Sequence, residues 1–537
     1  MLSNYLSIIA ISLTMIGCGG TGENDSQYPI QTANTVETST NSPSNTETNL
    51  SGLKNPDSRV FFGPRNVTII GRYEGGFIQD LDPGDRFGRD HDQAGDIDGD
   101  GNIDLIVGAR SDDDGAIDAG AVYILFMNEF GSVKHSQKIS ALEGELNEQL
   151  GEGDFFGYGV AGIGDYNDDD IPDVAVSLFG RSNQAIYVLH LNSDGTVLSK
   201  VKNNNIVAQG LSAMDINQDG KVDLIAAHPN EDNGGAISIL YLDEDSRVIP
   251  SQTFKISTTE GGLGDVLNVN DSFGGRESAL LGDLDGDGTL EIAVGAFMTN
   301  NGDGAIWILS IDPTSKSITE KQRITPGTPD FNELIPNTLN SNGTRGGQFG
   351  HALVAAGDLN GDGIGDLITG ANQYGSGIGY ILYLNADKTV QSFTRITPTE
   401  GGFDLNLIGT EDRFSRSISI VDRQRLEGEI TINFGGGVSP GGSGSIYSLA
   451  FQACGLDAQS NNTFWQGGST YFSNWTHSTQ TVSTPLNFDQ CVTKSFEYDA
   501  PYITFKVSDG RCIIKNGTAT LSNSEEGSRA YISNCPR

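Results

Sequence analysis

A short acidic segment recurs along this chain and narrows the folds that it can adopt. Each copy places oxygen-bearing side chains at positions 1, 3, 5 and 9, and at least four mostly apolar residues follow position 9. The first copy reads GDIDGDGNIDLIVGA, from Gly95 to Ala109, and its position 1 is Asp96. Alternating carboxylates and amides in a glycine-rich turn are typical of a loop that chelates Ca²⁺. The first question is which kind of calcium loop this is.

Five copies keep the complete set of side-chain oxygen donors. At positions 1, 3, 5 and 9 these are Asp96, Asp98, Asp100 and Asp104; Asp165, Asn167, Asp169 and Asp173; Asp215, Asn217, Asp219 and Asp223; Asp283, Asp285, Asp287 and Glu291; and Asp358, Asn360, Asp362 and Asp366. Position 7 has no shared side-chain chemistry, so we expect its backbone carbonyl to be the ligand. The residues at position 7 are Asn102, Ile171, Lys221, Thr289 and Ile364. We therefore predict about five bound Ca²⁺ ions, for which Mg²⁺, with its smaller octahedral shell, is a poorer match.

The residues around these donors predict a strand after each loop. Position 6 must turn sharply, and it is glycine in four copies and Asp170 in the second. An EF-hand would continue as a helix and place a bidentate Glu at position 12. Position 12 here is Val107, Val176, Ala226, Val294 or Thr369, none of which chelates through a carboxylate. A sixth copy starts at Asp422 but has lost the donors at positions 3 and 5, so we expect no metal there.

Two further elements recur around the loops in a fixed order. A Phe-Gly pair precedes the loop in four units, and it reads Phe414-Ser415 in the sixth. A strand-like segment led by Gly or Ala follows, as in GAVYILF and GAIWILSI. The first aspartates of successive units are 69, 50, 68, 75 and 64 residues apart. Repetition at this length, with about four short strands per unit, is typical of propeller blades.

These three elements together resemble the FG-GAP repeats of the integrin α-subunit N-terminal propeller and its bacterial relatives. The resemblance covers residues 60–451 and implies an all-β propeller of four-stranded blades with calcium loops between adjacent strands. The segment from Asn66 to Phe77 matches the piece that links successive units. We expect it to supply the outer strand of the last blade and so to close the ring. We count six units, and a seventh blade built from divergent C-terminal sequence is the alternative.

The net charge of the chain argues against some classes of binding partner. The chain carries 70 acidic and 32 basic residues, for a formal net charge of −38. Such a surface repels nucleic acid and anionic lipid headgroups, so we expect neither DNA nor RNA as a partner.

The N-terminus predicts export. Residues 1–17 read as a signal peptide, and the MIGC motif resembles a bacterial lipobox that would lipidate Cys18. An ordinary signal peptide with a chance cysteine is the alternative, because no Lys or Arg precedes the apolar run. Residues 18–59, rich in Ser, Thr and Asn, are expected to be a disordered tether. We expect an outer-membrane or cell-surface protein whose only membrane contact is the lipid anchor.

The C-terminal segment, residues 452–537, has a different composition and is expected to be a small β-rich module. It holds four of the five cysteines, namely Cys454, Cys491, Cys512 and Cys535. An even cysteine count in an exported segment predicts two disulfides, for which three pairings exist. Of these we favour Cys454–Cys491 with Cys512–Cys535.

These features favour a non-catalytic adhesion or binding protein over an enzyme. A tether, a calcium-stiffened ring and a terminal module suit the display of a recognition face to an extracellular protein or glycan. The alternatives are a polysaccharide lyase-like or phospholipase-like propeller enzyme and a structural scaffold of the envelope. The chain has six His, none in dyad-like spacing, and no nucleophile-elbow or phosphate-loop motif, so we assign no catalytic residue.

Overall fold

The computed structural model describes a β-rich body that begins at residue 59. The described residues are 59–61, 66–181, 183–264, 266–329, 331–333, 346–373, 376–397, 413–422, 429–436 and 442–455, with six strands between 470 and 532. No helix in this part of the chain is long and apolar enough to cross a membrane. The predicted signal peptide, lipidation at Cys18 and tether up to residue 58 lie outside the described residues. So do the side chains of all four cysteines that were expected to form disulfides.

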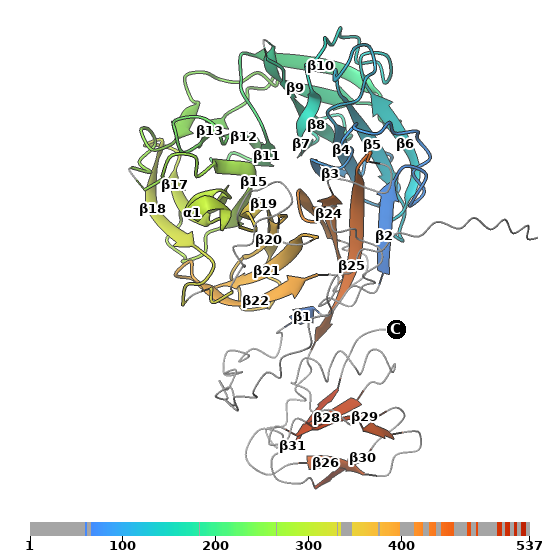
Figure 1. Ribbon diagram of the computed structural model, residues 1–537, viewed down its shortest axis with the longest axis vertical. Coiled ribbons are helices and arrows are strands. Elements are labelled where there is room, and N and C mark those ends of the chain that lie inside the picture. The colour runs from blue at the N-terminus through green and yellow to red at the C-terminus, as the bar shows by residue number, and fades with distance from the viewer. Residues whose placement is uncertain are drawn as a thin grey trace, which may run out of the picture. The chain divides into compact units, whose positions relative to one another are not determined.

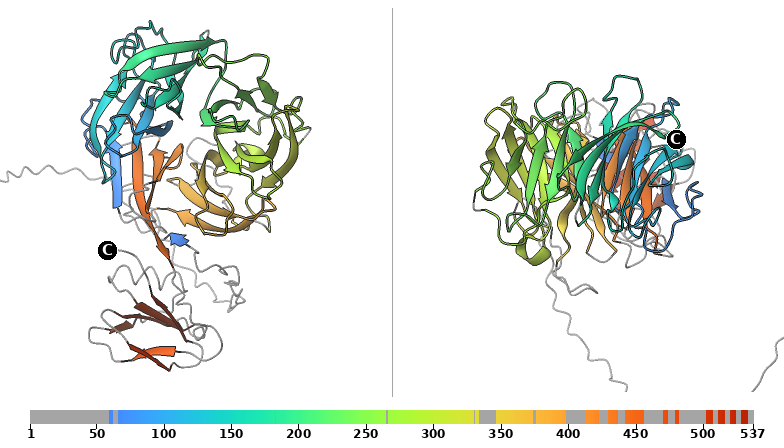
Figure 2. Two further views of the ribbon diagram at one scale, coloured as in Figure 1. Left: turned by 180° about the vertical axis from the view of Figure 1, so that it is seen from behind. Right: turned by 90° about the horizontal axis from the view of Figure 1, so that it is seen from above.

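Six antiparallel sheets surround a common axis (Figure 1), and Figure 2 shows the same ring from behind and edge-on. The innermost strands are β3 (His91–Gly95), β7 (Phe156–Gly164), β11 (Leu211–Met214), β15 (Phe273–Gly282), β19 (Phe349–Gly357) and β23 (Ile418–Asp422). Each innermost strand contacts the next one around the axis, and β23 contacts β3. The predicted all-β propeller is therefore confirmed, and the described residues form six blades.

Three further strands complete each blade outward from the axis. The second strands are β4 (Asp104–Ala109), β8 (Asp173–Phe179), β12 (Asp223–His228), β16 (Leu290–Ala296), β20 (Asp366–Ala371) and β24 (Glu429–Gly436). The third strands are β5 (Ala121–Met127), β9 (Gln184–Leu191), β13 (Ala236–Leu240), β17 (Ile306–Asp312), β21 (Ile378–Leu384) and β25 (Ser445–Gly455). The outer strands are β6 (Val133–Ile139), β10 (Val197–Asn204), β14 (Phe254–Ile256), β18 (Ser317–Ile324), β22 (Val390–Ile396) and β2 (Asn66–Gly71).

The sixth blade joins the two ends of the propeller sequence. Its outer strand, β2, pairs antiparallel with β25, in a register that runs from Asn66 opposite Ala450 to Gly71 opposite Ser445. The short strand β1 (Arg59–Phe61) pairs with the far end of β25. This confirms the prediction that the segment starting at Asn66 supplies the last outer strand. The pairing covers the outer side of β25 with a strand from the start of the propeller sequence and so joins the two ends of the ring.

The remaining described elements are short. One four-residue helix, α1 (Thr299–Gly302), lies between β16 and β17. Beyond residue 469 the described strands form a pair and a four-stranded sheet. These strands are β26 (Thr470–Ser473) and β30 (Thr520–Asn523), and β27 (Thr479–Thr481), β29 (Arg511–Lys515), β28 (Tyr502–Lys506) and β31 (Ser528–Ile532).

The apolar core consists of six clusters, one at each junction between neighbouring blades. Successive side chains of a strand point to opposite faces of its sheet. On β4, Ile106 therefore packs towards the second blade, while Leu105 and Val107 pack towards the sixth. Because both faces of each blade are covered, a second strand such as β4 is apolar at every residue after its position 9 carboxylate, which explains the run LIVGA.

A buried Phe fixes the spacing at five of these junctions. These residues are Phe87, Phe156, Phe273, Phe349 and Phe414, all 0% exposed. Each meets a glycine before the third strand of the preceding blade. These glycines are Gly444, Gly120, Gly235, Gly304 and Gly377, with φ between +89° and +104°. A Cβ on any of them would lie 2.0–2.2 Å from the carbonyl oxygen of the facing Phe. Both the conformation and the close approach therefore require glycine.

Replacing the glycine at the closing junction is expected to destabilise the ring. Gly444→Ala adds the strain of a positive φ and a contact 2.0 Å from the Phe87 carbonyl oxygen. We expect a loss of about 3 kcal/mol in the free energy of unfolding, measured by urea titration. Gly442→Ala is the matched control, because Gly442 has φ +80° but an added methyl group would meet no other atom of the described residues within 4 Å. An equal loss in both variants would contradict the close-packing account.

Candidate functional site

The five acidic loops each join an innermost strand to the second strand of the same blade. Position 9 is the first residue of β4, β8, β12 and β20, and the second residue of β16. The prediction that a strand follows the loop, as opposed to the second helix of an EF-hand, is therefore confirmed. Because every blade has the same strand order and direction, the five loops lie on one face of the ring. The positions 3 and 5 of the sixth copy, Gln424 and Leu426, lie outside the described residues.

One hydrogen-bond pattern shapes all five loops. In the fifth, Gly363 N donates to Asp358 Oδ2 at 2.7 Å, which links positions 6 and 1. Asp362 N donates to Asn360 Oδ1 at 2.9 Å, and Ile364 N donates to Asp362 Oδ1 at 3.0 Å. The same three bonds occur in the other four loops. The side chains at positions 1, 3 and 5 are therefore held around one turn before any cation is considered.

Two positions of each turn adopt a positive φ. Position 6 does so in all five loops, with φ of +68° at Asp170 and between +85° and +92° at the four glycines. This confirms the sharp turn predicted there. Position 4 also has a positive φ, between +60° and +78°, which was not predicted from the sequence. The residues at position 4 are Gly99, Asp168, Gln218, Gly286 and Gly361. The preference of Gly, Asp and Asn for this region was the available signal.

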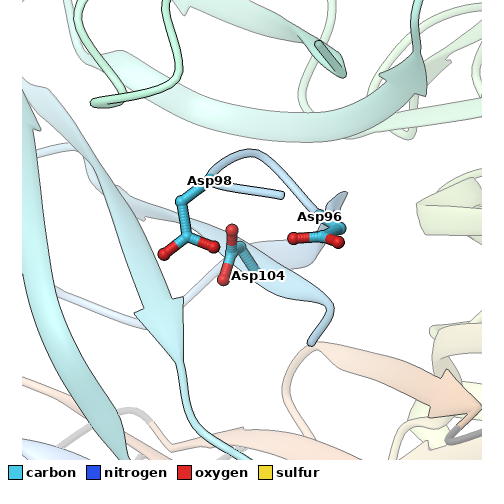
Figure 3. Close-up of side chains that lie close together, drawn as sticks. All are labelled: Asp96, Asp98 and Asp104. Atoms are coloured by element: carbon cyan, nitrogen blue, oxygen red, sulfur yellow. The ribbon is translucent and has the colours of Figure 1, made fainter. Parts of the chain in front are cut away.

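The structure brings carboxylates closest together in the first and fourth loops. Oxygens of Asp96, Asp98 and Asp104 lie within 4.8 Å of one another, and Figure 3 shows these three side chains converging. Asp283, Asp285 and Asp287 form the second such group. The predicted ligands Asp100 and Glu291 are not members of these groups. In the second, third and fifth loops, where position 3 is Asn, the three remaining carboxylates do not form such a group among the described residues.

The position 9 carboxylate has a structural role that was not predicted from the sequence. Asp366 is 0% exposed, and its two oxygens accept hydrogen bonds from Leu359 N at 2.9 Å and Leu384 N at 3.1 Å. The equivalents in the first two blades, Asp104 and Asp173, are bonded in the same way. Burial raises the pKa of Asp366 to about 7. Each carboxylate oxygen keeps a second lone pair, which leaves it able to bind a cation.

The donor chemistry of the loops fits a hard cation. All side-chain donors at positions 1, 3, 5 and 9 are carboxylate or amide oxygens, which Ca²⁺ prefers. In the first loop, Asp96 Oδ1 is buried and has no hydrogen-bond partner among the described residues. A buried carboxylate oxygen without a partner is costly unless a cation or water satisfies it.

A lysine accompanies each loop that has Asp at position 3. Lys134 Nζ lies 2.9 Å from Asp98 Oδ2 and also contacts Asp100. Lys388, in the β21–β22 turn of the next blade, contacts Asp285 Oδ2 at 2.6 Å and Glu291 Oε1 at 3.9 Å. Neither lysine was predicted from the sequence.

In the fifth loop, where position 3 is Asn360, a neutral residue replaces the lysine. Gln391, at the position on β22 that Lys134 has on β6, accepts from Asn360 Nδ2 at 3.2 Å. Four carboxylates with one ammonium carry the same formal charge as the three carboxylates of an Asn-containing loop. With the lysine included, the side chains at positions 1, 3, 5 and 9 of the first and fourth loops have a formal charge of −3, as do those of the three Asn-containing loops.

Comparisons with known proteins agree with this architecture. The FG-GAP repeat family model matches residues 275–309 and 349–382, which lie in the fourth and fifth blades. Integrin alpha-3 of Cricetulus griseus is 31% identical over 137 residues, which is 24% of this chain. The match spans 12% of the length of that relative.

Proposed function

Because the chain carries FG-GAP repeats in a six-bladed propeller similar to that of integrin α subunits, we propose that it is a calcium-stabilised binding protein. It presents one face of the ring to an extracellular protein or glycan. The observation that supports this most is the hydrogen-bonded turn repeated in five loops, together with the buried Asp96 Oδ1, which no described residue satisfies with a hydrogen bond. Loops on a rigid ring are suitable positions for recognition, because the scaffold fixes where they lie.

In this proposal, each loop holds one Ca²⁺ through the side-chain oxygens at positions 1, 3, 5 and 9 and the carbonyl at position 7. The bound ion supplies positive charge that offsets the repulsion among the carboxylates. In the first and fourth loops the four carboxylates form six pairs, each costing about 1–4 kcal/mol at 4 Å, depending on the dielectric. The protein itself contributes the turn, the buried position 9 carboxylate and, in these two loops, a lysine.

We also propose that the chain is exported and lipid-anchored at Cys18, at the outer membrane or cell surface of a bacterium. The MIGC motif and the polar tether support this location. A Cys18→Ser variant is expected to be recovered in the medium or periplasm, whereas the native chain is recovered with membranes. Membrane recovery of both forms would contradict the anchor.

A binding screen tests the function. The purified full chain is applied to arrays of glycans and matrix proteins, in millimolar calcium and in excess EGTA. We expect calcium-dependent retention on a restricted set of ligands, because the ring that positions the loops depends on the ion. The matched assay incubates the protein with uronic-acid polysaccharides and follows unsaturated product. Turnover there, without stable retention on any array, would favour the enzyme alternative and contradict the proposal.

The lysine of the fourth loop gives a prediction about how calcium and ammonium share the site. Lys388→Met removes a side chain that is 3% exposed and leaves the buried Glu291 without its ammonium. In EGTA we expect a loss of about 2–4 kcal/mol in the free energy of unfolding. In calcium the loss is expected to be much smaller, because the ion replaces the missing charge.

The control for this prediction is Lys255→Met. Lys255 pairs with Glu231 and Asp232, between β12 and β13, away from the acidic loops. Its substitution is expected to cost the same with and without calcium. Urea titrations of both variants in both buffers measure the difference, and a calcium-independent loss for Lys388→Met would contradict the shared-site account.

A further inference from the structure

A cationic pocket opens on the face of the ring opposite the acidic loops. Its cavity has a volume of about 270 Å³. The residues that line it lie at the beginnings of innermost strands and just after second strands, in four consecutive blades. The lining includes Arg276, Arg413, Arg416, Gln209, Gln348 and Phe297. The acidic loops lie at the other ends of the same strands, so the two features occupy opposite faces.

The arginines of this pocket form no ion pair within the described part of the chain. Arg276 and Arg416 are each 7% exposed, and Arg413 is half-buried. Among the described residues, no carboxylate forms a salt bridge with any of the three. Arg416 Nε is buried and has no hydrogen-bond partner in the described part of the chain, and Arg276 Nη1 donates to the Gln209 carbonyl oxygen at 3.5 Å. Buried guanidinium groups without a counter-ion are costly, so an anion is expected to complete the site.

Further arginines lie beside this pocket and extend the positively charged region. The centroid of the Tyr158 ring lies 4.0 Å from Arg110 Cζ and 5.2 Å from Arg276 Cζ. Arg86 and Arg110 line a neighbouring cavity of about 440 Å³. The charge of these clustered arginines is opposite in sign to the net charge of the chain, −38. A cluster of basic residues on an otherwise acidic protein indicates a binding site more than an ordinary solvent-exposed surface.

Two buried carboxyl groups lie near these arginines and offset only part of the positive charge of the pocket. Asp90 is 1% exposed and Glu277 is 7% exposed, and neither makes a hydrogen bond that meets normal geometry among the described residues. Burial raises the pKa of Asp90 to about 7 and also raises the pKa of Glu277. Burial disfavours the charged form of both carboxyl groups, so they offset less of the arginine charge than exposed carboxylates would.

We propose that this pocket binds an acidic saccharide residue through its carboxylate or sulfate group. This inference rests on the proposed binding function and names the class of ligand. A guanidinium group presents a planar fork of donors that matches a carboxylate or sulfate. The side-chain amides of Gln209 and Gln348 offer both donors and acceptors for sugar hydroxyls. The ring of Phe297 provides an apolar face against which a pyranose can pack.

The size of the pocket and the charge of the chain favour a short ligand. A cavity of about 270 Å³ is below the range for drug-sized ligands, roughly 300–1,000 Å³, and suits one sugar residue. The net charge of −38 repels long polyanions, because a long ligand extends beyond the pocket by more than the screening length. At physiological ionic strength the screening length is about 8 Å, so a short oligosaccharide responds mainly to the nearby arginines.

Titration calorimetry of the purified full chain in calcium tests this inference. The probes are trigalacturonate as a carboxylate source, a heparin-derived disaccharide as a sulfate source, neutral maltotriose and an oligo-glutamate peptide. We expect binding of at least one acidic saccharide, which identifies carboxylate or sulfate as the recognised group. We expect no binding of maltotriose, and weaker binding of the peptide. Binding is expected to weaken as salt is raised.

Two substitutions assign the binding to the pocket. Arg413→Gln is expected to weaken acidic saccharide binding by about tenfold or more, since it removes one charged fork. Arg247→Gln is the matched control, because Arg247 is an exposed arginine in the β13–β14 turn, outside the pocket. Arg416→Lys keeps the charge but loses the fork, and it is expected to fall between Arg413→Gln and the native chain. Melting curves of each variant show whether the fold is retained.

Several results would overturn the inference. These are the absence of binding to both acidic saccharides, equal binding of maltotriose, tighter binding of the peptide, or equal losses in Arg413→Gln and Arg247→Gln. A ligand found on the arrays that is neutral, and that Arg413→Gln still binds, would overturn this inference while leaving the proposed binding function intact.

Discussion

Excess EGTA is expected to lower the melting temperature of this protein by on the order of 10 °C. Each loop that binds calcium at a hundredfold excess over its dissociation constant contributes about 2.7 kcal/mol to the folded state. Five such loops together exceed the stability of many domains, roughly 5–15 kcal/mol. Removal of the ion also leaves the carboxylates of each turn to repel one another. Differential scanning calorimetry in calcium and in EGTA measures the shift.

The control for this measurement restores the metal. Calcium added back after chelation is expected to recover the original melting curve, whereas magnesium is expected to recover less, because its octahedral shell fits these loops poorly. A melting curve that is identical in calcium and EGTA would contradict the proposal that the loops need the ion.

Asp366→Ala is expected to destabilise the protein even when no calcium is present. The Asp366 carboxylate accepts hydrogen bonds from two buried backbone N–H groups, of Leu359 and Leu384. Alanine leaves both donors without a partner, at about 1–3 kcal/mol each. We therefore expect a loss of about 4 kcal/mol in the free energy of unfolding in EGTA, measured by urea titration. In calcium the loss is larger, because the loop also loses its ion.

Asp362→Ala is the matched control in the same loop. Asp362, at position 5, is exposed, and it accepts a hydrogen bond from Ile364 N within the turn. Its substitution is expected to remove the ion but to cost little in EGTA. If the two variants were equally stable in EGTA, the structural role assigned to position 9 would be wrong.

The features that were predictable from the sequence are those encoded within one repeat. The donors at positions 1, 3 and 5 belong to a single turn, so their spacing alone indicated their arrangement. The strand after position 9 followed from the apolar run and from Val107 at position 12. Closure by β2 was also predictable, because the segment from Asn66 repeats the linking piece of other units.

The features that were missed depend on contacts between parts of the chain that are distant in sequence. Lys388 reaches Asp285 from the next blade, across a separation of 103 residues. One of the two backbone partners of Asp366, Leu384 N, meets it only once β21 is placed beside β20. The arginine pocket draws on four blades, and no single repeat shows more than part of it. Only the closed ring brings these groups together.

The number of calcium ions bound per chain shows directly whether the five acidic loops are metal sites. Metal analysis of the native protein after equilibration with calcium is predicted to give five ions. The double variant Asp98→Ala, Asp285→Ala is predicted to give three, since it disables the first and fourth loops. A native protein that binds no calcium, or a double variant that retains the native number of ions, would contradict the account.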